Sequence, residues 1–424
     1  MRARLAEQLA AAEMKMLRGL GHLAADLGVR LFLVGGCVRD IILGRPREDW
    51  DLAIEGDGLA YARALAEAWH AKPVIHDRFL TATMRLRDGT HFDVTTARRE
   101  AYPASGALPV VQPASIERDL WRRDFSINAI AIELTPDQWG RILDPTGGRQ
   151  DIEAELVRAL HERSFEDDAT RIVRAIGFEQ RLGFTIEPQT EDWIRGAASG
   201  GALHTVSSER LGEVILPLLR DTVGPRALKR ANELGVARAM GARAAFTPTA
   251  LAALEQVPEG LKRFRAGHDP QARALACMAA LLVGRGVAAD RMVERLHLDR
   301  LTARELRSAQ RFLGAWPGGF APGQRDGDLW EQLRETTFAA AFALWLANDD
   351  AQVREVVQRY WHELRHTRPD FDAARLADMG FGPSPHFGDA LRVAVLSKLN
   401  RGAGPDEQLT AAARVLRHAR DYRE

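Results

Sequence analysis

The sequence predicts an α+β protein in which a mixed α/β part is followed by a long helical part. Between residues 30 and 145, short runs of β-branched and aromatic residues are separated by polar turns, which is typical of strands. From about residue 150 onward, alanine, leucine, arginine and glutamate dominate, which favours helices. A chain of 424 residues is also too long for one compact core, so several domains are expected.

The elements follow in order along the chain. Residues 1–28 carry apolar side chains at helical spacing and predict an amphipathic helix, and a second helix is expected over 58–70. Asp88 and Gly89 form a hairpin signal, so the two strands on either side of them are expected to pair. The predicted strands are 31–34, 50–54, 73–75, 82–87, 91–96 and 127–134.

The bulk composition predicts a soluble protein of the cytoplasm. Hydrophobic residues make up 46% and charged residues 27% of the chain, as in ordinary globular proteins. Neither a membrane-spanning run nor a secretory signal is visible. Cys37 and Cys277 match no metal or disulfide spacing, which favours a reducing compartment. A formal net charge of zero gives no support to a nucleic-acid partner, although a local basic face is still compatible with it.

The most informative segment combines a diglycine, an arginine and two aspartates. Gly35 and Gly36 let backbone N–H groups approach a ligand closely, and Arg39 can neutralise an anion. Asp49 and Asp51 are two residues apart on a predicted strand, so their carboxylates point to the same face. This combination suits a divalent metal together with a polyphosphate.

The segment resembles the first signature of the nucleotidyltransferase superfamily, in its branch of bacterial tRNA nucleotidyltransferases and poly(A) polymerases. The signature reads Gly-Gly-x-Val-Arg-Asp followed by Asp-x-Asp. The resemblance implies that Asp49 and Asp51 hold two Mg²⁺ ions and that Gly35, Gly36 and Arg39 hold phosphate.

A third carboxylate, Asp93, lies on the predicted strand 91–96. Polymerase-type sites often place such a group on a neighbouring strand, where it helps to bind metal and accepts the proton of the primer hydroxyl. An ordinary solvent-facing aspartate on an edge strand is an equally open interpretation.

Residues 119–131 contain a dense polar group that can recognise a ribose. Asp124 can accept hydrogen bonds from hydroxyls, Asn128 can both donate and accept, and Arg123 can reach a phosphate. A charged turn before a strand is the alternative. The order of residues resembles the family's second signature, Arg-Arg-Asp-Phe-Thr-x-Asn-Ala, with Ser126 in place of the threonine.

A third group comprises Asp168, Arg171 and Arg174, which are spaced three apart and are expected on one face of a helix. Cytosine and adenine both present an amine donor beside a ring-nitrogen acceptor, so an aspartate–arginine pair can accept them and reject guanine and uracil. A surface ladder of ion pairs is the alternative. The segment resembles the family's base-reading Glu-Asp-x-x-Arg, with Asp167 in place of the glutamate. The resemblance implies that Asp168 and Arg171 select the base and Arg174 supports the phosphates.

The resemblance, which covers about residues 30–215, implies a nucleotidyltransferase-type α/β head followed by a helical neck, body and tail. The expected boundaries are 1–145, 146–225, 226–365 and 366–424, with the tail in contact with tRNA. The expected reaction is template-independent addition of nucleotides from CTP and/or ATP to the 3′ end of tRNA, with Mg²⁺ as cofactor and neither a membrane nor a protein partner.

Several activities stay open: addition of C-C-A, of the two cytidines, of the final adenosine, or of a poly(A) tail. Segment 102–111, expected to be the flexible loop between the two signatures, is not obviously deleted, which disfavours a strictly CC-adding enzyme. It resembles the loop in bacteria that divide the work between two enzymes, so an A-adding enzyme is a serious alternative. A non-catalytic RNA-binding scaffold is the alternative from another class, and the clustered carboxylates argue against it.

Overall fold

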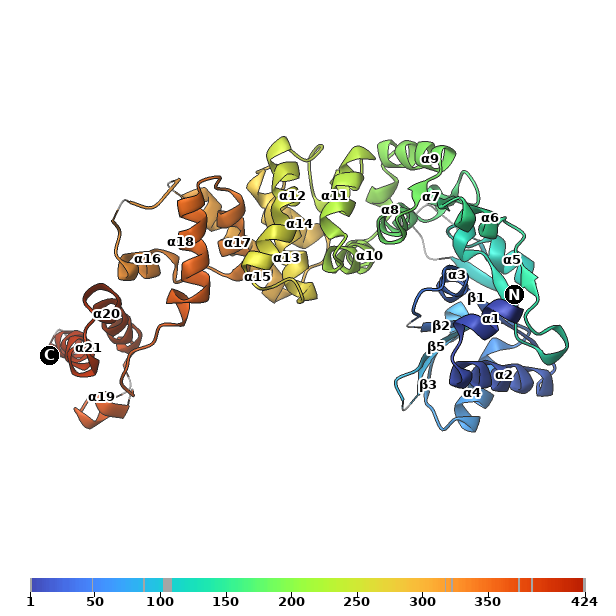
Figure 1. Ribbon diagram of the computed structural model, residues 1–424, viewed down its shortest axis with the longest axis horizontal. Coiled ribbons are helices and arrows are strands. Elements are labelled where there is room, and N and C mark those ends of the chain that lie inside the picture. The colour runs from blue at the N-terminus through green and yellow to red at the C-terminus, as the bar shows by residue number, and fades with distance from the viewer. Residues whose placement is uncertain are drawn as a thin grey trace. The chain divides into compact units, whose positions relative to one another are not determined.

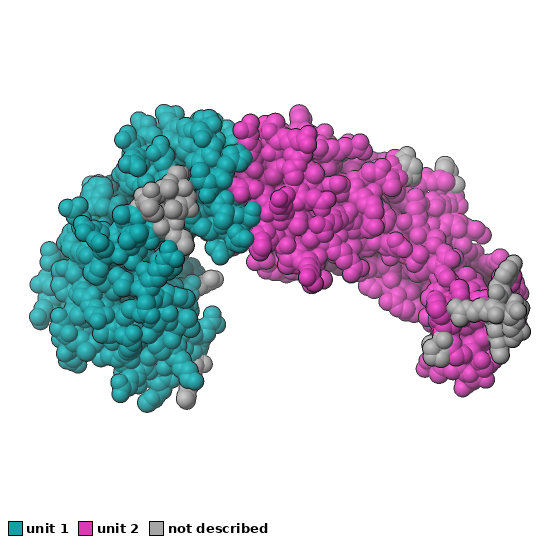
Figure 2. Space-filling view, turned by 180° about the vertical axis from the view of Figure 1, so that it is seen from behind, with its two compact units in different colours: residues 1–214, 233–236 teal, residues 215–232, 237–424 magenta. Residues whose placement is uncertain are grey.

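The computed structural model describes the chain except for Met1, Glu48, Arg87, 102–108, Pro317, Pro322, Ala373, Pro383 and 422–424. Most of the predicted loop over 102–111 therefore lies outside the described residues. The chain divides into two compact units, which Figure 2 shows in different colours. Unit 1 comprises Met1–Val214 and Glu233–Val236, and unit 2 comprises Ile215–Asn232 and Ala237–Glu424.

Unit 1 is built on a seven-stranded sheet with the order β3-β4-β5-β2-β1-β8-β9. The strands are β1 (Arg30–Val34), β2 (Asp49–Glu55), β3 (Pro73–His76), β4 (Thr81–Arg85), β5 (His91–Thr96), β8 (Ala131–Glu133) and β9 (Ile142–Leu143). β2 and β5 run parallel, whereas β4 and β5 pair antiparallel, as the hairpin signal predicts. Phe32 and Val34 on β1 pack with Ala53 on β2 against Ile116 and Leu120, which places a core on one face of the sheet.

Five of the six predicted strands are confirmed. The sixth, predicted over 127–134, is wrong in its first half. Residues Ser126–Asn128 form a 3₁₀ turn, and only Ala131–Glu133 pairs as β8. In this turn the Asn128 N–H donates to the Phe125 carbonyl at 3.0 Å, and the Asn128 side chain donates to Asp124 Oδ1 at 3.1 Å. A local contact therefore overrides the β-prone composition.

The single helix predicted over 1–28 is instead two helices, α1 (Arg2–Gln8) and α2 (Ala11–Asp26). Ala10 is extended between them, and its N–H donates to the Glu13 carboxylate at 2.7 Å, which starts the second helix. The second predicted helix is confirmed as α4 (Gly58–Ala68). Helices α2 and α4 lie side by side (Figure 1), joined by a hydrogen bond from the Tyr61 hydroxyl to the Leu20 carbonyl at 3.0 Å.

Unit 1 contains further elements outside the seven-stranded sheet. They are α3 (Gly36–Leu43), β6 (Arg98–Ala101), β7 (Val110–Pro113), α5 (Ile116–Trp121), α6 (Gly148–Glu153), β10 (Leu156–Val157), α7 (Ser164–Asp167), α8 (Thr170–Leu182), β11 (Thr185–Ile186) and α9 (Pro188–Ser199), with α10 (Ser208–Arg220) crossing into unit 2. β6 and β7 form a separate antiparallel pair. The polar sequence of β6 carries no β-prone pattern, so the sequence does not predict this strand.

The placement of Asp168 on a helix is wrong. α7 ends at Asp167, Asp168 has extended backbone angles (φ −145°, ψ 98°), and α8 begins at Thr170. The Asp168 carboxylate accepts hydrogen bonds from the N–H and hydroxyl of Thr170, at 3.0 and 2.7 Å. An aspartate side chain that bonds to the backbone two residues on competes with helix continuation, and this explains the break.

Unit 2 consists largely of helices, as the composition predicts. They are α11 (Gly224–Glu233), α12 (Pro248–Arg263), α13 (Pro270–Val283), α14 (Ala289–Arg295), α15 (Arg300–Ala315), α16 (Asp326–Leu333), α17 (Phe338–Leu346), α18 (Ala351–His362), α19 (Ala374–Asp378), α20 (Phe387–Arg401) and α21 (Pro405–Asp421). α13 and α17 are buried along most of their length, and α20 and α21 share a smaller core. Among the described residues, no helix combines the length and apolar character needed to cross a membrane.

Candidate active site

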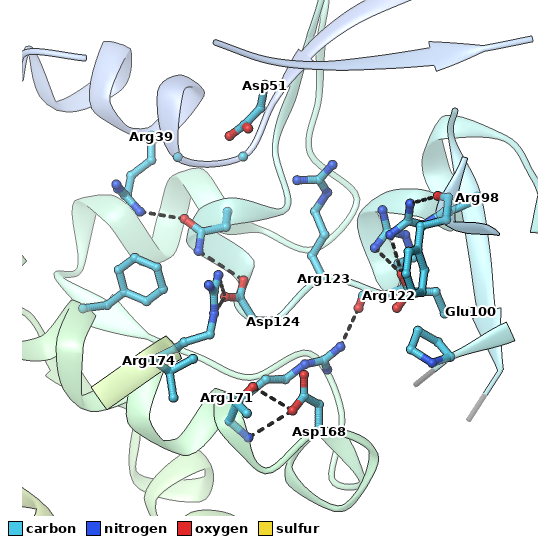
Figure 3. A pocket seen from close by; sticks show the side chains of 18 residues that line it. Arg39, Asp51, Arg98, Glu100, Arg122, Arg123, Asp124, Asp168, Arg171 and Arg174 are labelled. Atoms are coloured by element: carbon cyan, nitrogen blue, oxygen red, sulfur yellow. Dashed lines mark hydrogen bonds and ion pairs between the residues drawn. The ribbon is translucent and has the colours of Figure 1, made fainter. Parts of the chain in front are cut away.

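A cavity of about 620 Å³ in unit 1 brings together most of the residues predicted from the sequence. Its lining includes Gly35, Gly36, Arg39, Asp51, Arg123, Asp124, Asn128, Asp168, Arg171 and Arg174. Asp49 and Asp93 are not part of this lining. Residues from three segments, far apart in the sequence, therefore face one space (Figure 3).

The diglycine lies where β1 ends and α3 begins. Gly35 has φ +76°, a conformation that glycine adopts without strain, and a Cβ placed there would lie 2.8 Å from Asp51 Oδ2 and 3.2 Å from Arg123 Nη1. The missing side chain thus keeps open the space between a carboxylate and a guanidinium. The start of α3 borders the same space, and its N–H groups favour an anion.

The carboxylates lie on one face of the sheet. Asp51 is opposite Asp93 in the register of β2 and β5, and Asp49 is opposite His91. Asp49 and Asp93 have side chains that are 59% and 44% exposed, whereas Asp51 is partly buried and faces the cavity. His91 Nδ1 lies 2.9 Å from Asp49 Oδ1 without the angle of a hydrogen bond, and the Asp93 carboxylate accepts from the Thr83 hydroxyl at 2.7 Å.

The surroundings of Asp51 raise the pKa of its carboxyl group. Burial is the main cause, and the neighbouring charges of Asp93 and Asp49 add to it, while Arg123 acts in the opposite direction. A divalent cation would relieve this repulsion, and carboxylate oxygens are ligands that Mg²⁺ accepts. No group of three or more His, Cys, Asp or Glu side chains in the described part of the chain is arranged to hold an ion. A magnesium ion held by Asp51 and its neighbours would need further ligands, and water can supply them.

A chain of hydrogen bonds joins Arg39 to Arg174. Arg39 Nη1 donates to Asn128 Oδ1 at 2.7 Å, Asn128 Nδ2 donates to Asp124 Oδ1 at 3.1 Å, and Arg174 Nε donates to Asp124 Oδ2 at 2.9 Å (Figure 3). The Phe178 ring has both guanidinium groups against it, with centroid distances of 5.1 Å to Arg39 and 5.7 Å to Arg174. The two arginines are therefore fixed relative to each other.

The pKa of Asp124 is lowered to about 2. Burial alone would raise it, but the charge of Arg174 and the hydrogen bonds from Asn128 and Arg174 outweigh burial. Asp124 is thus ionised at neutral pH, and part of its hydrogen-bonding capacity is already used to orient Arg174.

Asp168 and Arg171 face the same cavity. Asp168 Oδ1 accepts from Arg210 Nη2 at 2.9 Å, in addition to its bonds from Thr170. Arg171 is 6% exposed and donates from Nη1 to the Ser164 hydroxyl at 2.8 Å and from Nη2 to the Arg122 carbonyl at 2.9 Å. Both side chains are therefore held in one orientation.

Sequence reasoning missed other residues that line the cavity: Phe79, Arg98, Glu100, Pro109, Arg122, Thr170, Phe178 and Val214. Arg122 belongs to the dense polar group within residues 119–131, although the sequence gives it no separate role, and Phe178 lies within residues 164–184 without a signal of its own. Arg98, Glu100 and Pro109 belong to or flank the β6–β7 pair, whose position beside the cavity no local pattern indicates.

Several known proteins are similar to this chain. Residues 31–158 match the poly A polymerase head domain. An A-adding tRNA nucleotidyltransferase of Geobacter sulfurreducens is 37% identical over 249 residues, which are 59% of this chain and 28% of that protein. An A-adding tRNA nucleotidyltransferase of Halalkalibacterium halodurans is 39% identical over 229 residues, 54% of each protein. The chain thus spans about half or less of the length of these curated relatives.

The structural likeness extends over the whole chain. A solved structure of the Thermotoga maritima CCA-adding enzyme complexed with tRNA is 25% identical, has a TM-score of 0.79, and covers 99% of this chain and 98% of that one. The resemblance inferred from the three signatures is therefore confirmed. Residues 31–158 thus match the poly A polymerase head domain, and the chain is similar in fold to a CCA-adding enzyme over nearly its whole length.

Proposed function

We propose that this protein adds nucleotides from CTP and/or ATP to the 3′ end of tRNA without a template and releases pyrophosphate. The observation that carries the proposal is the arrangement of the cavity. The Gly35–Gly36 turn, Asp51 and Arg123 lie at one end, and Asp168 and Arg171 lie at the other (Figure 3). One space thus offers groups for a triphosphate and groups for a base.

In this proposal the triphosphate binds beside the diglycine turn. The backbone N–H groups of Gly35 and Gly36 approach its oxygens, and Arg39 and Arg123 neutralise its charge. Asp124 and Asn128 hold the ribose and also keep Arg39 and Arg174 in position, through the hydrogen bonds described above.

Asp49 and Asp51 would hold Mg²⁺, the divalent metal that this kind of site typically uses. When bound, the metal would activate the primer hydroxyl and neutralise charge on the leaving pyrophosphate. Asp93, beside Asp51 on the neighbouring strand, is suited to help bind the metal and to accept the hydroxyl proton.

The base is selected by protein side chains in place of a template. Asp168 offers a carboxylate oxygen to the exocyclic amine of cytosine or adenine, and Arg171 offers a donor to the ring nitrogen. Guanine presents the opposite order, and uracil has no amine. The bond that Arg210 donates to Asp168 and the bond that Arg171 donates to Ser164 supply the rigidity that this discrimination needs.

The domain assignment follows from the same proposal: a catalytic head over 1–145, a base-reading neck over 146–225, a body over 226–365 and a tail over 366–424 that contacts tRNA. The main sheet ends at Leu143, close to the proposed end of the head. A protein acting on tRNA in this way is expected in the cytoplasm, without a membrane or protein partner.

Addition of the final adenosine alone is a second candidate. It is favoured by the two curated relatives reported above, both of which are named A-adding enzymes. Addition of the two cytidines alone, or of a poly(A) tail, is compatible with the same cavity.

The decisive experiment incubates the purified protein and Mg²⁺ with three forms of one tRNA: lacking the whole C-C-A end, lacking only the final adenosine, or complete. Each is offered CTP, ATP, both, GTP or UTP, and product lengths are read on a gel. Extension by C-C-A, or by adenosine only, distinguishes the two candidates. RNA binding without any extension would refute the enzyme and support the non-catalytic scaffold.

A further inference from the structure

Asp119, on α5, is a fully buried carboxylate that lies behind the cavity and does not line it. Its two oxygens are divided between two arginines. Arg122 donates to Oδ1 from Nε and Nη2 at 2.9 and 2.7 Å, and Arg123 donates to Oδ2 from Nε and Nη2 at 3.2 and 2.9 Å. The Arg98 backbone N–H also donates to Oδ1 at 3.1 Å. Paired donation by a guanidinium fixes its plane as well as its position.

The remaining nitrogen of Arg123 faces the substrate space. Nη1 lies 3.2 Å from the point where a Cβ on Gly35 would sit, next to Asp51 Oδ2 at 2.8 Å from that point. Asp119 takes up the other two N–H-bearing positions of the guanidinium, so the plane it imposes determines where Nη1 points. In Figure 3 the Arg123 side chain extends toward Asp51.

The second arginine links Asp119 to the other end of the cavity. Arg122 Nη1 donates to Glu100 Oε1 at 2.8 Å, and the Arg122 backbone carbonyl accepts from Arg171 Nη2 at 2.9 Å. One carboxylate thus supports a residue at the phosphate end directly and a residue at the base end through one intermediate.

The charge of Asp119 agrees with this arrangement. Burial would raise the pKa of its carboxyl group, but Arg123 and Arg122 outweigh burial and lower it. The carboxylate stays ionised and lets two like-charged guanidinium groups lie close together, which would otherwise repel each other.

We propose that Asp119 is a positioning residue for nucleotide binding, which holds Arg123 so that Nη1 faces the triphosphate. The proposal rests on the proposed function for the identity of the ligand, whereas the geometry concerns any polyphosphate in this cavity. The alternative is that Asp119 stabilises the fold alone.

Glu133 offers a matched control in the same unit. It is also a buried carboxylate, 1% exposed, and holds a guanidinium through two bonds, from Arg30 Nε to Oε1 at 3.0 Å and from Nη2 to Oε2 at 3.1 Å. It does not line the cavity. Glu133→Gln therefore reports the effect of losing a buried ion pair without the proposed positioning.

The experiment compares the full-length wild type with Asp119→Asn, Arg123→Ala, the double variant and Glu133→Gln. Calorimetry with Mg²⁺ measures Kd for ATP, CTP and tripolyphosphate, and thermal melts measure folding. We expect Asp119→Asn to weaken binding about 10-fold or more, the scale of one lost bond between charged groups. The double variant should bind within about twofold of Arg123→Ala, because residues that act through one another are not additive. Glu133→Gln should keep the wild-type Kd within about twofold.

Three results would overturn the positioning role: an unchanged Kd in Asp119→Asn, losses that multiply in the double variant, or an equal loss of affinity in Glu133→Gln. If Asp119→Asn does not fold, Arg123→Lys replaces it. Lysine keeps the charge but has one side-chain nitrogen, so it cannot bond to Asp119 through two nitrogens while a third faces the cavity. Unchanged nucleotide binding by Arg123→Lys would therefore also overturn the proposal. If the wild type binds tripolyphosphate but binds neither ATP nor CTP, the proposed function is refuted, and the variants still test the role of Asp119 through tripolyphosphate binding. Wild type that binds none of the three would overturn both.

Discussion

Replacing Asp124 by asparagine removes the charge that faces Arg174 and keeps nearly the same shape. The Asp124 carboxyl group has its pKa lowered from 3.8 to about 2, and a shift of this size corresponds to about 2 kcal/mol of folding stability. Removing one partner of a buried ion pair usually costs about 3–5 kcal/mol. We expect the lower figure because the Arg174 side chain is 48% exposed and water can solvate it once its partner is neutral.

The stabilisation should depend on pH in a defined direction. A lowered pKa means that the ionised carboxylate is bound more tightly in the folded state, so its contribution is complete above about pH 4. It is lost as the pH falls from about 4 toward 2, where the folded state also becomes protonated. The difference between wild type and Asp124→Asn should therefore be about 2 kcal/mol at pH 7 and shrink in that interval.

The assay follows urea unfolding at a series of pH values. Since the chain has two units, a global signal does not guarantee a two-state transition, and hydrogen exchange in peptides from α8 should report unit 1. Glu133→Gln is the control for a general effect of removing a buried carboxylate. A difference for Asp124→Asn that is below about 0.5 kcal/mol at pH 7, or equally large at pH 7 and pH 2.5, would refute this account of the Asp124–Arg174 pair.

Further predictions concern the phosphate and base ends of the cavity. Asp49→Ala or Asp51→Ala should abolish nucleotide incorporation while circular dichroism and the melting temperature stay near wild type; wild-type rates in either variant would contradict the metal assignment. Asp168→Ala should lose activity or discrimination among nucleotides, and an unchanged preference for CTP and ATP over GTP and UTP would remove this residue from the base site. Gly35→Ala should cost about 1–2 kcal/mol of stability from its positive φ, and should also weaken nucleotide binding because the added Cβ meets Asp51 at 2.8 Å. Gly183→Ala, at φ +77° with no atom within 4 Å of the added Cβ, should show the stability loss in urea melts but leave Kd unchanged; equal binding losses in the two variants would argue against a steric role at Gly35.

Local sequence was sufficient to predict most of the strands, the helical second half of the chain and the shared face of Asp49 and Asp51. The reason is that a strand's two-residue period and a helix's composition act over neighbouring residues, whatever the rest of the chain does. The three signatures also predicted which residues line the same cavity. This was possible because the chemistry of each signature can be recognised from the residue types and their spacing.

The break at Asp168 shows where local reasoning failed. The composition of residues 164–184 favours one continuous helix, yet the Asp168 carboxylate bonds to Thr170 and also pairs with Arg210, 42 residues later. A partner so far along the chain leaves no mark on a helical pattern, although it contributes to the orientation of the side chain proposed to read the base.

Long-range packing also determines which polar side chains face the cavity and which hold other side chains in place. Asp51 faces the cavity while Asp49 does not line it, and Asp119 serves two arginines from behind. These distinctions depend on contacts between β1, β2, β6 and α5, whose residues are tens of positions apart. An aspartate that binds substrate and an aspartate that holds an arginine have the same side chain, and only their neighbours in space distinguish them.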